Sequence, residues 1–394
     1  MYRTERHIII KNKELDKLCF LSKNLYNYCN YQIKQYYINT KLFLPYNDLI
    51  KTLTKEDQID YRSLPTQTSQ QIIMLLYKNW VSFFKKIKID KSSRPPKYKS
   101  KTGRNIVIFT NQQIRIKDNF IHFPKMTNLE PLQTKVTTKI NEVRILPQQS
   151  CFIIEVVYEK EKTEHDLNHN LYLSIDLGIN NLCSMISNSD LEPILLNGKI
   201  IKSINQFYNK KKALLMSYIG NKGISNRLNQ LTLKRNNLIQ NYLHHTSKFI
   251  ITYCIKNKIK NIVIGYNKDW KQGVNIGKVN NQKFVNIPYL KLIQQIQYKA
   301  EENNIAVVLN EESYTSKCDS LALESLNKQE SYLGKRVKRG LFQSSFKKVI
   351  NADVNGSINI LRKVIGDDFI QNLTNRGLVF NPVKVNPLQS FICV

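Results

Sequence analysis

Two aspartates that lie far apart in the sequence have the surroundings expected of metal ligands. Asp176 ends the apolar run "LYLSID", directly before the turn "LGIN". A carboxylate at the end of a buried strand costs free energy unless it is paired or bound to a metal. Asp353 lies in the first turn of a predicted helix, "NADVNGSINI". Taken singly, Asp176 could cap a turn, and Asp353 could simply be a favourable acid at a helix N-terminus.

Taken together, the two aspartates indicate a more specific chemistry. A strand-end aspartate early in a three-strand meander and a later aspartate on a helix are the arrangement that an RNase H-like nuclease needs. In such a site, carboxylates from distant segments hold two Mg²⁺ ions about 4 Å apart, which activate water and stabilise the leaving oxygen. The pair therefore predicts Mg²⁺-dependent hydrolysis of phosphodiester bonds.

The segment that must position these aspartates is predicted to be a mixed α/β sheet. From Leu171 onward, three strand-like runs precede helical segments over about 200–257. A strand "NIVIGY", a helix with Pro288 in its first turn and a strand "IAVVLNEE" follow. This succession of strands and helices is typical of an α/β sheet. An irregular, polar segment, residues 313–345, precedes the helix that carries Asp353.

The N-terminal part is predicted to be a small β-barrel that carries a helical insert. Residues 5–10 are strand-like, and six more strand-like runs lie between residues 106 and 160. Apolar residues at helical spacing predict helices over about 17–37 and 66–88. The basic, proline-rich segment 90–105, "DKSSRPPKYKSKTGRN", cannot be regular structure throughout.

The composition favours a nucleic-acid partner. The chain has 60 Lys and Arg against 30 Asp and Glu, a net charge of +30, and a basic surface binds polyanions by releasing their counterions. No apolar run predicts a membrane span or a signal peptide, so we expect a cytoplasmic, nucleoid-associated protein, or one in the equivalent compartment that holds the host genome. The seven cysteines are dispersed without a CxxC pair, which argues against a cysteine-based structural zinc.

Several motifs resemble the TnpB (OrfB) family of transposon-encoded proteins. "SIDLGINNL" resembles the first RuvC motif of that family, and "RGLFQ…VINADVNGSINILRKV" resembles the third. Three other stretches are also similar to it: "NLYNYCNYQIKQYY", "RPPKYKSKTGRNIVIF" and "YLHHTSKFIITYCI". The similarity extends over roughly residues 5–365.

The resemblance implies an RNA-guided DNA endonuclease that is related to the type V CRISPR effectors. It implies an RNase H-like (RuvC) nuclease domain of α/β fold, with Mg²⁺ as the cofactor. It also implies two partners, a guide RNA made from the transposon end and target double-stranded DNA with a short adjacent motif. The protein could be a monomer or a homodimer.

The same resemblance implies a division into five parts. We expect a β-barrel, wedge-like domain, a helical recognition insert, a RuvC-like domain, a loop that replaces a zinc-ribbon insert, and a C-terminal tail. In that order they comprise residues 1–16 with 89–165, 17–88, 166–312 with 346–365, 313–345, and 366–394.

Two positions depart from the family pattern. The second RuvC motif usually ends its strand in glutamate, whereas the run Ile262–Ile264 ends in Gly265, which has no side chain to bind a metal. The family usually follows "TSK" with paired CxxC motifs that bind zinc. The corresponding stretch, "YTSKCDSLALESL", holds only Cys318, which cannot make a tetrahedral site. We therefore expect the loop to fold without zinc.

The missing glutamate has candidate replacements. Glu311 and Glu312 end the strand "IAVVLNEE", and strand alternation puts one of them on each face of the sheet. We predict a catalytic metal site of Asp176, Asp353 and either Glu311 or Glu312. Asp269, in the loop after the strand that lost its glutamate, is another candidate. The two glutamates could instead be solvated acids before a loop.

Two basic segments are predicted to contact nucleic acid. "RPPKYKSKTGR" can bind phosphates and stack on a base, although it could also be a merely solvated loop. "YLGKRVKRG" precedes Asp353, where it could guide a strand into the active site. The candidate residues are Arg94, Lys97, Tyr98, Lys99, Lys101 and Arg104 in the first segment, and Lys335, Arg336, Lys338 and Arg339 in the second.

Non-enzymatic functions remain as alternatives. Without a glutamate at position 265, the protein could be an RNA-guided DNA-binding regulator that does not cut. It could also be an accessory DNA-binding protein of transposition without a guide. Because Asp176 and Asp353 are both retained, the sequence favours the enzyme.

Overall fold

The computed structural model describes residues 1–148, 150–220, 223, 225–267 and 287–389. The chain divides into two compact units, Met1–Glu161 and Lys162–Val394. No helix in the described part of the chain combines the length and the apolar character needed to span a lipid bilayer.

The first unit contains an open antiparallel sheet instead of the predicted closed barrel. Its order is β1-β7-β6-β2, and β3-β4-β5 form a separate sheet. Among the described residues, the edge strands β1 and β2 do not pair with each other. Closure of a barrel needs a continuous ladder, and strands as short as β2 to β5 do not extend it. The strands are β1 (Tyr2–Ile9), β2 (Val107–Thr110), β3 (Arg115–Lys117), β4 (Phe120–His122), β5 (Leu132–Gln133), β6 (Ile140–Pro147) and β7 (Phe152–Glu159).

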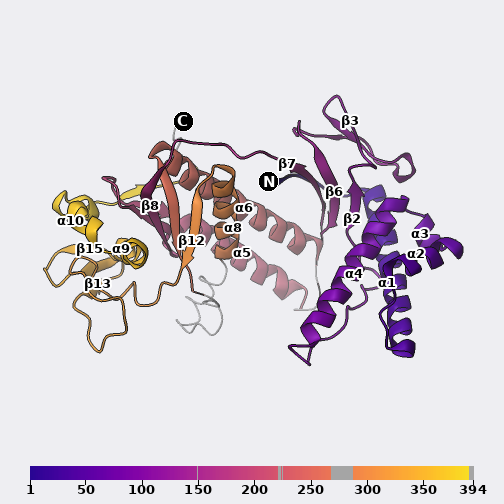
Figure 1. The fold of residues 1–394 in the computed structure, drawn as a ribbon, viewed down its shortest axis with the longest axis horizontal. Coiled ribbons are helices and arrows are strands. Elements are labelled where there is room, and N and C mark those ends of the chain that lie inside the picture. The colour runs from indigo at the N-terminus through magenta and orange to yellow at the C-terminus, as the bar shows by residue number, and fades with distance from the viewer. Residues whose placement is uncertain (149, 221–222, 224, 268–286, 390–394) are drawn as a thin grey trace. The chain divides into compact units, whose positions relative to one another are not determined.

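The predicted helices of the first unit are confirmed, and two short helices join them. The side chain of Asn12 caps the first helix by accepting the N–H of Leu15, and Pro65 directly precedes the fourth. Trp80 is 1% exposed and donates its Nε1 hydrogen to Asn30 Oδ1 at 3.0 Å, which ties α4 to α1. The two helices lie side by side in Figure 1. The helices are α1 (Lys13–Thr40), α2 (Tyr46–Lys55), α3 (Ile59–Arg62) and α4 (Thr66–Ile87).

The second unit is built on a six-stranded sheet, and the predicted mixed α/β character is confirmed. Its order is β12-β11-β8-β9-β10-β16. The strand β8 is antiparallel to β9 and parallel to β11, and β11 is parallel to β12. The strands are β8 (Asn168–Leu177), β9 (Asn181–Ser187), β10 (Ile194–Asn197), β11 (Ile259–Gly265), β12 (Ala306–Asn310) and β16 (Val383–Val385).

Helices cover both faces of this sheet (Figure 1). Ile262 and Ile264 of β11 join the core formed with α6 (Asn226–Lys256) and α8 (Tyr289–Glu302). Val263 lies between them and joins the core formed with α9 (Ala352–Ile365). Alternation along a strand explains why neighbouring residues serve opposite cores. The helix α5 (Lys199–Tyr218) packs against α6.

The chain beyond residue 312 is more regular than predicted. Within the loop 313–345, β13 (Lys335–Lys338) and β14 (Leu341–Gln343) form a small sheet with β15 (Val349–Asn351). After Gly366, α10 (Asp368–Asn375) leads to β16, which pairs in parallel with β10. Strands of three or four residues carry too little periodicity to be recognised from sequence.

Candidate active site and nucleic-acid interface

Asp176 lies near the end of β8, a central strand of the six-stranded sheet. It pairs with Ser184 of β9, and its carboxylate accepts a hydrogen bond from the N–H of Leu177. Gly356 of α9 lies directly against it, because a Cβ atom at position 356 would stand 2.7 Å from Asp176 Oδ2. The glycine therefore lets the helix approach the strand closely enough to cover this carboxylate.

Asp353 is held in the first turn of α9. Asn351 caps the helix by accepting the N–H groups of Asp353 at 2.9 Å and Val354 at 3.3 Å. Asn181, the first residue of β9, donates its Nδ2 hydrogen to Asp353 Oδ2 at 2.7 Å. Asn181 was not singled out from the sequence, although it stands within the motif "SIDLGINNL".

Two serines join α9 to the strands beneath it. Ser174 Oγ of β8 donates to the carbonyl of Ser357 at 2.7 Å. Ser357 Oγ in turn donates to the carbonyl of Ser184 on β9 at 3.0 Å. All three serines are buried. These hydrogen bonds fix the distance between the helix that carries Asp353 and the strand that carries Asp176.

Glu312 occupies the space beside Gly265. The last pairs of β11 join Ile264 to Ile175 of β8 and Gly265 to Asn310 of β12, so Gly265 ends a strand next to Asp176. A Cβ atom at position 265 would stand 2.8 Å from Glu312 Oε2. The carboxylate of Glu312 therefore reaches the place where a side chain at position 265 would begin.

The two glutamates that were candidates from the sequence differ in their surroundings. Glu312 is partly buried, and its N–H donates to Asn267 Oδ1 at 3.1 Å. Glu311 is exposed and accepts a hydrogen bond from the hydroxyl of Ser313. Of the pair, only Glu312 interacts electrostatically with Asp176. The remaining candidate, Asp269, lies outside the described residues.

The electrostatics show that three carboxylates share this edge of the sheet. Burial raises the pKa of Asp176 well above its usual range, and the neighbouring charges of Glu312 and Asp353 raise it further, whereas Arg336 opposes the shift. Burial also raises the pKa of Glu312 to about 7, against the charge of Lys363. Like charges held together out of water favour protonation or the binding of a cation.

The donor atoms fit a divalent cation such as Mg²⁺. Carboxylate oxygens are the ligands that Mg²⁺ prefers, and it keeps several of its own water molecules, so few protein ligands suffice. Within the described residues, no group of three or more carboxylate, histidine or cysteine side chains is placed so that it could hold a metal ion.

The loop 313–345 is organised by two buried carboxylates that the sequence did not reveal as important. Glu324 accepts the N–H groups of Asp319 at 2.6 Å and Leu333 at 2.8 Å. Asp319, 0% exposed, accepts hydrogen bonds from several donors, namely the N–H groups of Leu321, Ala322 and Ser345 and the hydroxyls of Ser344 and Ser345. Cys318 is also buried. We use the name loop knot for Asp319, Glu324 and the N–H and hydroxyl groups that donate hydrogen bonds to their carboxylates.

The loop brings a basic strand to the carboxylates. Arg336 of β13 is exposed, and its charge acts on Asp176. The neighbouring basic residues, Lys335, Lys338 and Arg339, are exposed as well. Of this part of the predicted nucleic-acid interface, Arg336 is the residue whose charge acts on a candidate metal ligand.

The other predicted nucleic-acid segment, residues 94–104, lies along α1 in the first unit, and we call it the strap. Asn27 bonds to both the N–H and the carbonyl of Lys99, at 2.8 and 2.9 Å. Asn30 donates to the carbonyl of Pro96 at 3.0 Å. Arg94, Lys97, Tyr98, Lys99 and Lys101 are exposed along the strap, whereas Arg104 pairs with Asp16 at 2.7 Å. Arg104 is thus engaged in holding the strap to the helix.

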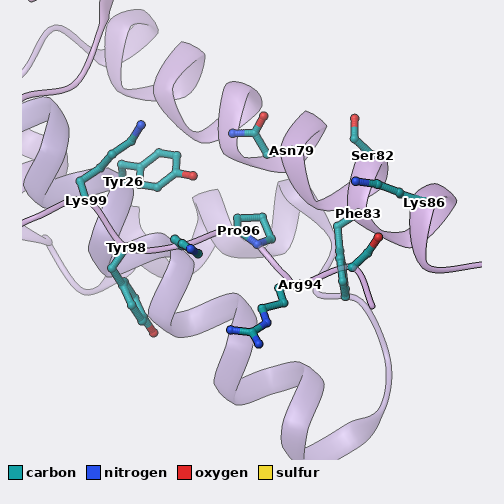
Figure 2. A pocket seen from close by; sticks show the side chains of 11 residues that line it. Tyr26, Asn79, Ser82, Phe83, Lys86, Arg94, Pro96, Tyr98 and Lys99 are labelled. Carbon is teal, nitrogen blue, oxygen red and sulfur yellow. The ribbon is translucent and has the colours of Figure 1, made fainter. Parts of the chain in front are cut away.

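A groove of about 450 Å³ runs between the strap and α4. Figure 2 shows Asn79, Ser82 and Lys86 along α4, which forms one wall of the groove. Tyr26 and Lys99 lie together at one end of it. Lys99 Nζ lies 5.1 Å from the centre of the Tyr26 ring. Cations, rings and amides together are typical of surfaces that bind nucleic acid.

Comparisons with known proteins agree with the motifs. Residues 155–271 match the family model OrfB_IS605, described as a probable transposase, and residues 289–360 match the model described as the Cas12f1-like TNB domain. No curated protein matches the chain.

One of the solved structures that resemble the chain has a TM-score above 0.5 and shares its fold. A chain of "Cryo-EM structure of the Cas12f1-sgRNA-target DNA complex" is 15% identical, with 88% of this chain and 81% of that chain covered and a TM-score of 0.56. A chain of "Structure of the mini-RNA-guided endonuclease CRISPR-Cas_phi3" is 8% identical, with 92% of each covered and a TM-score of 0.46. The resemblance seen in the motifs is thereby confirmed. Residues 155–271 are thus similar to the OrfB family of probable transposases and residues 289–360 to the TNB domain of Cas12f1-like proteins, and the fold is similar to that of a solved Cas12f1 chain.

Proposed function

We propose that the protein is an RNA-guided DNA endonuclease that hydrolyses phosphodiester bonds at a two-metal, RuvC-like site. One observation carries the proposal. Glu312 Oε2 lies 2.8 Å from the position of a Cβ atom on Gly265, the residue that replaces the usual glutamate, and it interacts with Asp176. The lost carboxylate thus has a substitute from the neighbouring strand end.

Asp176, Asp353 and Glu312 are the residues that would hold Mg²⁺. When bound, the ions would activate a water molecule and stabilise the leaving oxygen. Asn181 fixes the orientation of Asp353 through its hydrogen bond to Oδ2. Glu311 is exposed and turned to Ser313, so we assign the third ligand to Glu312 alone.

The basic residues of β13 and the following turn would bring the DNA strand to the carboxylates. Arg336 is exposed beside Asp176, so its guanidinium could bind a phosphate next to the scissile bond. The positive charge also offsets part of the repulsion between the carboxylates and the DNA backbone.

Guide RNA and target DNA are the partners that this family fold and the charge support. The solved Cas12f1 complex contains both a single guide RNA and target DNA. The net charge of +30 gives this chain the electrostatic capacity to bind two polyanions. The strap with the groove beside it would supply contacts from the first unit, and we retain the five-part division proposed above, with an open sheet in place of the barrel.

A second candidate function is RNA-guided DNA binding without cleavage. It is favoured by a single observation, that within the described residues the carboxylates do not already converge on one metal position. In this case Asp176, Asp353 and Glu312 would be the remnant of a site that no longer binds two ions.

A cleavage experiment separates the two functions. The protein would be expressed together with the DNA that flanks its gene, so that any native guide RNA is formed, and purified as a complex. The complex is then incubated with Mg²⁺ and a plasmid that carries the guide's target beside a randomised motif. Glu312→Gln and Glu311→Gln form a matched pair, because each removes one charge from adjacent residues.

We expect cleavage by the unchanged protein and by Glu311→Gln, and loss of cleavage with Glu312→Gln. Retention of cleavage in Glu312→Gln would refute the relocated ligand. Binding of the target without cleavage by the unchanged protein would establish the second function.

A further inference from the structure

Lys363 holds the main chain on both sides of Glu312. Its Nζ atom donates to the carbonyl of Glu311 at 3.1 Å and to the carbonyl of Ser313 at 2.8 Å. These two carbonyls belong to the residues immediately before and after Glu312. A single ammonium group therefore fixes the peptide groups that flank the proposed ligand.

A third hydrogen bond completes this support. The N–H of Glu312 itself donates to Asn267 Oδ1 at 3.1 Å. The backbone of Glu312 is thus held by Asn267, two residues after the end of β11, and by Lys363 of α9. Since the side chain leaves the backbone in a direction set by these peptide groups, the support directs the carboxylate of Glu312 towards Gly265.

The helix α9 connects Lys363 to the rest of the site. Residues 353, 356, 360 and 363 are separated by three or four positions, so their side chains share one face of the helix. Asp353 is a proposed ligand, and Gly356 lies against Asp176. Ile360 Cδ1 would lie 2.5 Å from a Cβ atom at Gly265. One helix face therefore touches all three parts of the carboxylate site, and Lys363 is its last member.

The hydrogen bonds of Lys363 leave Glu312 available to a cation. Both bonds go to main-chain oxygens. Lys363 thus holds the backbone of the proposed ligand without occupying its carboxylate oxygens.

We propose that Lys363 is a positioning residue that aims Glu312 into the metal site and so makes the relocated ligand effective. The inference rests on the proposed metal site but not on cleavage itself. Glu312 follows the end of β12 and precedes a loop, whereas a glutamate at position 265 would be held by the ladder of β11. The hydrogen bonds of Lys363 would supply the support that Glu312 does not receive from a strand.

The test measures Mn²⁺ binding, with electron paramagnetic resonance as the readout and the purified complex as the sample. The variants are Lys363→Ala, Glu312→Gln, the double variant, and Lys256→Ala. The last is the matched control, since Lys256 is an exposed lysine in the last turn of α6, another helix of the same unit. Target-DNA cleavage is measured in parallel over a range of Mg²⁺ concentrations.

We expect Lys363→Ala to weaken Mn²⁺ binding by about 10- to 100-fold, as is usual for residues that orient metal ligands. The Mg²⁺ concentration for half-maximal cleavage should rise in parallel. In the background of Glu312→Gln, the same change should have little further effect, because both act through one carboxylate. Lys256→Ala should bind Mn²⁺ as the unchanged protein does.

Two outcomes would overturn the inference. One is that Lys363→Ala binds Mn²⁺ as tightly as Lys256→Ala. The other is that its effect is undiminished in the Glu312→Gln background, which would place the role of Lys363 elsewhere. If the protein binds Mn²⁺ through Glu312 and Lys363 but does not cleave, the endonuclease proposal fails while the inference stands.

Discussion

Two groups of carboxylates in the second unit differ in how many hydrogen bonds they accept from the protein. In the loop knot, Asp319 is 0% exposed and accepts hydrogen bonds from several N–H and O–H donors. At the sheet edge, Asp176 accepts the N–H of Leu177, and the carboxylate of Glu312 accepts, among the described residues, a single long hydrogen bond of 3.5 Å from Asn267. The edge carboxylates also repel each other.

The difference separates a structural role from a functional one. A buried carboxylate with a full set of donors stabilises the fold, because its hydrogen bonds replace those to water. A buried carboxylate beside other carboxylates destabilises the fold until a cation or a proton arrives. We infer that the knot holds the loop through its hydrogen bonds, whereas the proposed function accounts for the unfavourable arrangement at the edge, since a bound cation would offset it.

The largest expected effect comes from Asp176→Asn. Because orienting residues alone account for about 10- to 100-fold in metal affinity or activity, removal of a direct ligand should lower cleavage by more than about 100-fold. The same change removes repulsion from a buried site, so thermal stability without metal should rise. Cleavage assays and thermal unfolding in EDTA measure the two effects. A fall in both activity and stability would mean that Asp176 is a structural carboxylate like Asp319.

An exchange of residues tests whether the third ligand has moved. Gly265→Glu alone should abolish cleavage, because the new Cβ atom would lie 2.8 Å from Glu312 Oε2 and 2.5 Å from Ile360 Cδ1. Gly265→Glu combined with Glu312→Gly returns the carboxylate to the usual strand end. We expect the combined variant to cleave at least about tenfold faster than either single variant, as coupled sites do. Rates in the combined variant no higher than in the singles would show that the two positions are not interchangeable.

The knot should respond to substitution in the opposite way to the edge. Asp319→Asn keeps the volume but points an NH₂ group at donors such as Ser345. We expect the free energy of unfolding to fall by about 2–4 kcal/mol, since a buried group would lose charge-assisted hydrogen bonds. Urea unfolding measures it, with Glu330→Gln, an exposed acid of the same loop, as the control. An equal effect of the two changes would mean that the knot does not hold the loop.

The sequence alone was sufficient to predict the position of a residue where that position follows from the strand or helix to which the residue belongs. Asp176 and Asp353 stand at a strand end and a helix start, and both positions were predicted from local patterns. The choice between Glu311 and Glu312 required the fold, because it depends on which side chain faces Gly265. Local alternation could state only that the two face opposite ways.

Residues that act across the fold escaped prediction. Lys363 donates to carbonyls about 50 positions earlier in the chain, and Asp319 bonds to Ser344 25 positions later. Lys363 lies on a predicted helix and Asp319 in a loop, but the partners of both are distant in the sequence, so no local signal marks these contacts. The predicted barrel was wrong for a related reason, since strand-like runs reveal that strands exist but not whether the last one pairs with the first.

The edge carboxylates should make stability without metal depend on pH. Because the pKa of Glu312 is about 7 instead of its ordinary 4.5, the folded protein binds a proton that the unfolded chain has released over that range. Stability without metal should therefore fall as pH rises from about 4.5 to 7, and the raised pKa of Asp176 adds to the trend. Thermal unfolding in EDTA at several pH values measures it. Mg²⁺ should flatten the curve, and an unchanged slope in Glu312→Gln would contradict the assignment.

The smallest expected effect concerns Arg336, which links the loop to the edge. Its charge lowers the pKa of Asp176, so Arg336→Gln should move the pH of half-maximal cleavage upwards. Because Arg336 is exposed and screened by solvent, the rate at pH 7 should fall only by about threefold at low salt, and by less at high salt. Lys338→Gln removes the same charge from the same strand, yet Lys338 has no such effect on Asp176. Both changes should weaken DNA binding, but only Arg336→Gln should shift the pH profile. Equal profiles would mean that β13 serves the DNA alone and does not tune the carboxylates.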